Sequence, residues 1–83
     1  MYYVYILQSE VDGSFYTGFT ENLEKRVVQH NNGESAYTSR KMPWKLVYFE
    51  EMNSKTEAIK RERFLKAQKN KIFYQRLINS LDR

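Results

Sequence analysis

Five side chains in this sequence have the chemistry to bind a phosphate, hold a cation and move a proton: Tyr5, Tyr16, Arg26, His30 and Glu62. A guanidinium forks onto phosphate oxygens through two hydrogen bonds. A lone carboxylate can hold Mg²⁺, which keeps several of its own waters. A phenol beside a cation can orient or deprotonate water, and an imidazole can relay the proton. Together these groups would meet the requirements of phosphodiester hydrolysis.

The two phenols are expected on neighbouring antiparallel strands. Residues 2–8 form a β-prone run that is apolar or aromatic on both faces, which indicates a central strand. Residues 15–19 are again aromatic or β-branched, and Asp12-Gly13 between the two runs is a strong hairpin signal. Gly18 interrupts the second run and marks a bulge or a close approach to the backbone.

The guanidinium and the imidazole are expected on one face of the next helix. Thr20 can serve as its N-cap. Leu23, Arg26, Val27 and His30 then follow at i, i+3, i+4 and i+7, which places them on a single face. We therefore expect Arg26 and His30 to face the strand that carries the second phenol.

The carboxylate belongs to a later helix. Ser54 and Glu57 form a capping box that predicts where this helix begins. Ala58, Glu62 and Leu65 share one face at i, i+4 and i+7. Glu62 is thus a carboxylate among residues expected to point inward, although pairing with a neighbouring Arg or Lys is the alternative.

The remaining elements complete an α+β fold of order ββαβαα within one domain, residues 1–83. Residues 46–50 read as a third strand that pairs with the first. Residues 34–45 form a polar loop that is long enough for a functional role. Asn70 can cap a third helix, whose apolar residues recur every four positions at Phe73, Leu77 and Leu81. Helices are expected to pack on a small antiparallel sheet.

Composition limits the classes of function. The net charge is +4, divided into −2 up to Ser54 and +6 from Lys55 onward. A basic C-terminal third favours a polyanionic partner or forms an ordinary solvated helix surface. The absence of Cys excludes disulfides and thiolate metal sites. No apolar run approaches the ~20 residues of a membrane span, and Met1 leads straight into strand-like sequence, so we expect a cytoplasmic protein.

Two short motifs resemble a known family. The tripeptide YVY at 3–5, followed by YTG at 16–18, is similar to the paired signature of the GIY-YIG nucleases. The similarity runs from about residue 2 to residue 66 and includes the segment 38–48. It is greatest to the small single-domain bacterial members.

The resemblance implies roles for six residues: Tyr5, Tyr16, Gly18, Arg26, His30 and Glu62. Tyr5, Tyr16, Arg26 and His30 would be catalytic, with Tyr16 as the base or its activator. Glu62 would be the sole protein ligand of a divalent metal, Mg²⁺ or Mn²⁺. The resemblance also implies a three-stranded antiparallel sheet flanked by helices and the hydrolysis of a nucleic-acid backbone.

Two positions depart from the family pattern. Tyr3 stands where the first motif has Gly, and Phe19 stands where several members have Lys directly after the second motif. If that Lys helps to activate the phenol, another cation must replace it here. The main alternative is therefore a nucleic-acid-binding module with weak or no cleavage. A structural or protein-interaction domain is the third interpretation.

The expected partner is DNA, possibly structured or branched, bound by a monomer. Basic side chains that can contact its backbone are Arg40, Lys41, Lys60, Arg63 and Lys66. The Lys-rich run 60–71 is equally typical of a solvated helix face.

Overall fold

A three-stranded antiparallel sheet lies at the centre of the protein, whose computed structural model describes residues 1–80. The strands are β1 (Tyr2–Ser9), β2 (Phe15–Thr20) and β3 (Trp44–Met52), in the spatial order β2-β1-β3. Both pairings are antiparallel, and Tyr5 lies opposite Gly18. The predicted central strand and the hairpin are confirmed.

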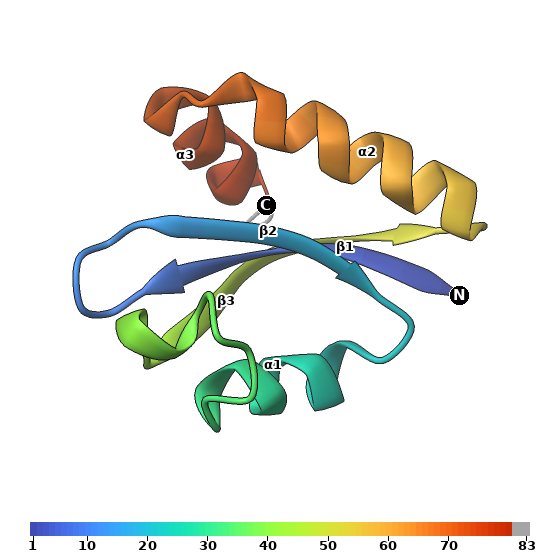
Figure 1. The fold of residues 1–83 in the computed structure, drawn as a ribbon. Coiled ribbons are helices and arrows are strands. Elements are labelled where there is room, and N and C mark those ends of the chain that lie inside the picture. Colours follow the sequence, from blue (N-terminus) through green and yellow to red (C-terminus); the bar gives the residue numbers. More distant parts are fainter. Residues whose placement is uncertain (81–83) are drawn as a thin grey trace.

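Helices cover both faces of the sheet (Figure 1). The helix α1 (Leu23–Asn31) lies on one face, and α2 (Lys55–Gln68) and α3 (Lys71–Ser80) lie on the other. A short 3-10 helix (Ser39–Lys41) occupies the segment between α1 and β3. The order ββαβαα agrees with the expectation from sequence. Within residues 1–80, no helix has both the length and the apolar character to cross a membrane.

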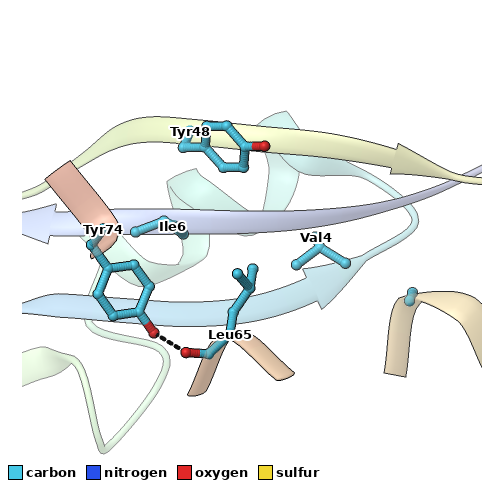
Figure 2. Close-up of a cluster of buried hydrophobic side chains, with 6 residues drawn as sticks. Val4, Ile6, Tyr48, Leu65 and Tyr74 are labelled. Atoms are coloured by element: carbon cyan, nitrogen blue, oxygen red, sulfur yellow. Dashed lines mark hydrogen bonds between the residues drawn. The ribbon is translucent and has the colours of Figure 1, made fainter. Parts of the chain in front are cut away.

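The face beneath α2 and α3 holds the larger hydrophobic core. Val4 and Ile6 of β1 pack there with Leu65 of α2 and Tyr74 of α3 (Figure 2). The Tyr74 hydroxyl donates a hydrogen bond to the Leu65 backbone oxygen over 2.6 Å, which satisfies a buried polar atom and ties α3 to α2. Because strand residues alternate between faces, the neighbours of Val4 and Ile6 in β1 point the other way.

The opposite face carries the polar site. Tyr5 and Leu7 of β1 are buried there with Trp44 at the start of β3. Leu23 and Val27 of α1 pack against them, as their helical spacing predicts. One face of the sheet therefore carries the larger hydrophobic core, whereas the other packs Tyr5 and Tyr16 against α1.

The first helix begins later than expected. Asn22, not Thr20, is the N-cap, and its side chain accepts from Lys25 N over 3.1 Å. Thr20 instead ends β2 in register with Tyr3, and its hydroxyl accepts from Asn22 N over 3.2 Å. The prediction of Thr20 was wrong because pairing with β1 extends β2 through this residue, and Asn is an equally good cap.

The other predicted helix starts are confirmed. Ser54 accepts from Glu57 N over 3.2 Å at the start of α2, and Asn70 accepts from Ile72 N over 2.9 Å at the start of α3. The third strand is longer than residues 46–50, because its pairing with β1 extends to Trp44 and Met52. The predicted repeat position at residue 81 lies outside the described residues.

An ion pair fixes α2 against β3. Arg61 donates to both carboxylate oxygens of Glu50, over 2.9 and 2.8 Å, and Tyr48 donates to the same carboxylate. A two-point contact between planar groups sets the rotation of the helix as well as its position. Arg61 is therefore paired with Glu50 of β3 and does not pair with Glu62, its neighbour in sequence.

Candidate active site

A buried hydrogen bond joins β1 to α1 at the centre of the site. The Tyr5 hydroxyl lies 2.9 Å from His30 Nε2, and both residues are at most 1% exposed. Alternation in β1 points Tyr5 toward α1, and the helical period brings His30 onto the face that meets the sheet. The predicted orientation of His30 is confirmed.

The second ring nitrogen of His30 bonds to a residue of the loop. His30 Nδ1 lies 2.8 Å from Thr38 Oγ1, and Thr38 donates its own proton to the Ser35 backbone oxygen at 3.5 Å. Thr38 therefore accepts from Nδ1–H, which leaves Nε2 to accept from the Tyr5 hydroxyl. Trp44 Nε1 donates to the Thr38 backbone oxygen over 2.8 Å and holds the loop in place.

Gly18 makes room for the Tyr5 ring. A Cβ at Gly18 would lie 2.7 Å from the Tyr5 hydroxyl oxygen, 2.9 Å from its Cζ and 3.2 Å from a ring carbon of Tyr16. Real Cβ atoms essentially never lie within 3.0 Å of another heavy atom, so the Tyr5 ring would have to move. The close approach that the sequence predicted at Gly18 is thus made by the two phenols.

Arg26 faces both phenols. Partial burial alone would lower the pKa of Arg26, but the hydroxyls of Tyr5 and Tyr16 outweigh burial and raise that pKa. Arg26 also donates from Nη1 to Gln29 Oε1 over 3.1 Å, which limits where the guanidinium can point. Its charge therefore interacts with both hydroxyls, as expected of a group that binds an oxyanion.

The two phenols lie in different environments. Burial raises the pKa of Tyr5 to about 12, against the opposing effect of Arg26 and with smaller additions from Tyr16 and Glu62. Tyr16 is half-buried, and its ring lies 4.9 Å from that of His30 and 6.3 Å from that of Tyr5. Tyr16 is therefore the phenol that meets solvent.

Glu62 belongs to α2, on the face of the sheet opposite α1 (Figure 1). Its negative charge nevertheless contributes to the raised pKa of Tyr5. Lys66, one turn further along α2, has its Nζ 3.4 Å from Glu62 Oε1 and 5.9 Å from the centre of the Tyr16 ring. The Glu62 side chain is only 16% exposed. Glu62 is thus largely buried, as its helical spacing predicts, and it also forms the pair with a neighbouring Lys that the sequence left open as the alternative.

The donor set around Glu62 suits Mg²⁺ or Mn²⁺ rather than a metal that needs several protein ligands. Among residues 1–80, no group of three or more His, Cys, Asp or Glu side chains is placed to share an ion. Mg²⁺ accepts a single carboxylate because it keeps several waters and takes its other ligands from phosphate. Glu62 is the residue that would hold it.

The predicted basic residues divide into three groups. Lys66 lies at the site. Lys41 forms an ion pair with Asp12 over 3.1 Å at the far end of the hairpin. Arg40, Lys60 and Arg63 are exposed, and their contact with nucleic acid stays a prediction.

Sequence reasoning missed the two loop residues that complete the surroundings of the phenols. Thr38 is fully buried and orients His30, whereas Tyr37 is exposed and stacks near Tyr16, with ring centres 5.8 Å apart. An aromatic residue in an otherwise polar loop was the available signal for Tyr37. The only sequence signal for Thr38 was its position in the 38–48 segment that resembles the family, because a Thr in a loop is ordinarily solvated.

Residues 1–77 match the family model described as the GIY-YIG catalytic domain. The chain belongs to the GIY-YIG family. This is a nuclease family, and the roles of the individual site residues in the chain remain predictions. Tyr3, which replaces the Gly of the first motif, packs its ring edge-on against Phe49 of β3.

Small GIY-YIG proteins of bacteria are similar to this chain over most of their length. A UPF0213 protein of Clostridium perfringens is 55% identical over 67 residues, which cover 80% of this chain and 71% of that protein. One of Staphylococcus saprophyticus is 48% identical over 62 residues, 74% of each chain. The solution NMR structure of a UPF0213 protein from Bacillus halodurans has a TM-score of 0.56 at 36% identity, covering 90% of this chain and 81% of that one.

The contact at Gly18 predicts a specific effect of Gly18→Ala. The added methyl group must displace Tyr5, so we expect a loss of about 1–3 kcal/mol in the free energy of unfolding and shifted NMR signals of His30. His30 is the only His of the sequence, so its signals are unambiguous. Gly13→Ala is the control: it strains a positive φ of 76° far from the imidazole and should leave those signals in place. Unchanged His30 signals in Gly18→Ala would contradict this account.

The buried imidazole predicts an unusual titration. Burial, together with the positive charge of Arg26, lowers the pKa of His30 from 6.5 to about 4. The unfolded chain therefore binds a proton at His30 more tightly than the folded protein does. The stability that neutral His30 contributes to the fold is complete above pH 6.5 and is lost as the pH falls toward 4. An NMR titration of the folded protein should give a midpoint near 4, whereas the urea-unfolded chain should titrate near 6.5. A folded midpoint near the unfolded value would show that His30 is not enclosed.

Proposed function

We propose that this GIY-YIG protein is a divalent-metal-dependent endonuclease that hydrolyses phosphodiester bonds of DNA. The observation that carries the proposal is the meeting of both phenols at His30: the Tyr5 hydroxyl lies 2.9 Å from His30 Nε2, and the Tyr16 ring lies 4.9 Å from the imidazole. The two hydroxyls also raise the pKa of Arg26, and the Nζ of Lys66 lies near both the Tyr16 ring and Glu62. These residues come from β1, β2, α1 and α2. Such convergence of a cation, two phenols and a carboxylate has no evident value for folding, but it suits a phosphate and its attacking water.

The two phenols have separate tasks in this proposal. Tyr5 donates a hydrogen bond to neutral His30 and has a pKa of about 12, so it stays protonated and positions its neighbours. Tyr16 is open to solvent and lies near Lys66 and the Glu62 carboxylate. As a phenolate beside the Lys66 cation, Tyr16 orients the attacking water and accepts its proton, which restores the neutral phenol. Arg26 binds the phosphate oxygens that gain charge as the bond breaks.

Glu62 would hold the metal. When bound, Mg²⁺ or Mn²⁺ supplies positive charge to the scissile phosphate. The side chain is oriented for this role because Arg61, next to it, is fixed on Glu50 and sets the rotation of α2. Its only ion-pair partner among the described residues is Lys66, at 3.4 Å, and a half-exposed pair of this kind contributes little to stability.

Lys66 takes the place of the Lys that is absent at position 19. Phe19 belongs to the hydrophobic side of β2 and packs against the core under α2 and α3, so it brings no charge to the phenols. The Nζ of Lys66 lies 5.9 Å from the centre of the Tyr16 ring, within the range of a cation–π contact. A cation from α2 therefore stands beside the phenol that the second motif supplies.

The alternative is a DNA-binding module with weak or no cleavage, acting as a monomer like the proposed enzyme. Phe19 is the observation that favours it, because a cation held by a flexible side chain on another element activates a phenol less reliably. DNA of branched or otherwise irregular structure is the proposed partner in either case.

Replacement of Glu62 separates the two functions. Glu62→Gln should lower Mg²⁺-dependent nicking of plasmid DNA by at least about a hundredfold and leave DNA affinity within about twofold, because the carboxylate holds the metal and not the DNA. Glu57→Gln is the matched control: an exposed carboxylate in the first turn of the same helix, whose loss should leave nicking unchanged. Full activity in Glu62→Gln would overturn the metal role of Glu62. If the wild type nicks no DNA with Mg²⁺ or Mn²⁺, the endonuclease proposal fails and the DNA-binding module is the function that remains.

A further inference from the structure

A hollow of about 480 Å³ opens beside Tyr16. Three parts of the fold meet there: β2 forms one wall, α2 and α3 form another, and the loop between α1 and β3 contributes the rim. Its lining residues are Phe15, Tyr16, Thr17, Tyr37, Lys66 and Tyr74. Tyr16, Tyr37 and Lys66 belong to the site already described, whereas Phe15, Thr17 and Tyr74 do not, so the hollow extends that site.

Aromatic rings make up most of its wall. Tyr37 is 79% exposed, and its ring stands 5.8 Å from that of Tyr16 at an angle of 45°. Phe15 and Tyr74 lie 5.2 Å apart at 34° on the opposite side. A ring as exposed as Tyr37 contributes little to folding, whereas a flat aromatic partner would bury its free face.

The polar groups of the hollow are few and well placed. Thr17 is buried, and its hydroxyl lies 3.5 Å from that of Tyr74, whose proton is donated to the Leu65 backbone oxygen. Because the Tyr74 hydroxyl donates to Leu65, its oxygen can still accept a hydrogen bond and the Thr17 hydroxyl keeps a proton to donate, so the pair can bond a polar group in the hollow. Lys66 Nζ, tethered to Glu62 and half exposed, supplies a positive charge beside the rings.

We propose that this hollow binds an unstacked nucleobase that neighbours the scissile phosphate of DNA. A nucleobase is flat, stacks on aromatic side chains whatever its sequence, and carries polar edges and an adjacent phosphate. The aromatic walls, the hydroxyl pair and Lys66 match these three properties in turn. The inference rests on the proposed function for the position of the phosphate, but base binding itself requires no cleavage.

The consequence is a preference for DNA with an unpaired nucleotide. A base inside a duplex is stacked on both faces and must first be extruded, which costs a few kcal/mol. A gap, bulge or single-stranded segment avoids most of that cost. The hollow thus selects DNA in which one base is unpaired and unstacked, and no contact in it depends on which base that is.

Fluorescence of 2-aminopurine tests the inference without any cleavage. The probes are two DNA duplexes that differ only in whether the 2-aminopurine lies in a one-nucleotide bulge or is paired with thymine, and binding is measured in EDTA. The wild type should quench the bulged base and bind that duplex about tenfold more tightly than the paired one. Tyr37→Ala should abolish most of this preference with little change for the paired duplex, and Tyr37→Phe should retain it because the ring remains.

Phe49→Ala is the control for loss of an exposed aromatic ring. Phe49 is 37% exposed on β3, the strand at the opposite edge of the sheet from β2, and its loss should leave the preference intact. Equal wild-type affinity for the two duplexes, binding without quenching, or a Tyr37→Ala variant with unchanged preference would each overturn the inference. If the preference holds but Mg²⁺ supports no nicking, the proposed function fails and the base site stands. If Mg²⁺ supports nicking but the preference is absent, the base site fails and the proposed function stands.

Discussion

The hydrogen bond between the Tyr5 hydroxyl and His30 Nε2 is the constraint on which the rest of the site depends. It is buried, so breaking it would leave two polar groups without partners in a dry environment. It also joins β1 to α1, because one partner comes from the centre of the sheet and the other from the last turn of the helix. The position of α1, and of the Arg26 guanidinium that α1 carries, follows from this contact and from the packing of Leu23 and Val27 around it.

That constraint gives two identical side chains different chemistry. Tyr5 is enclosed, donates a hydrogen bond to His30 and fits there because Gly18 has no side chain. Tyr16, two residues before Gly18 on the same face of β2, keeps contact with solvent and with the charges that α2 brings to the edge of the sheet. The two residues are of the same type, and their different surroundings assign positioning to Tyr5 and the reaction to Tyr16. Enzymes that use paired titratable groups often separate the two roles in this way.

Much of this architecture could be predicted from the sequence, for local reasons. Alternation in residues 2–8 separates the two faces of the central strand, and helical spacing places Arg26 and His30 together. The capping residue of α1 was misplaced because strand pairing, a long-range effect, extends β2 through Thr20. The roles of Thr38 and Tyr37 were hidden for a similar reason: their neighbours, His30 and Tyr16, lie close only once the loop has folded against the sheet. Charge counting likewise gave no sign that Lys66 would stand beside Tyr16.

The tautomer of His30 is the most direct test of the central constraint. A long-range ¹H–¹⁵N correlation spectrum of the folded protein at neutral pH reports which ring nitrogen carries the proton, and the sequence has a single His. The account predicts a neutral ring protonated at Nδ1, with Nε2 showing the shift of an acceptor. A ring protonated at Nε2 would mean that the Tyr5 oxygen accepts from His30, and the division of roles between the two phenols would then be contradicted.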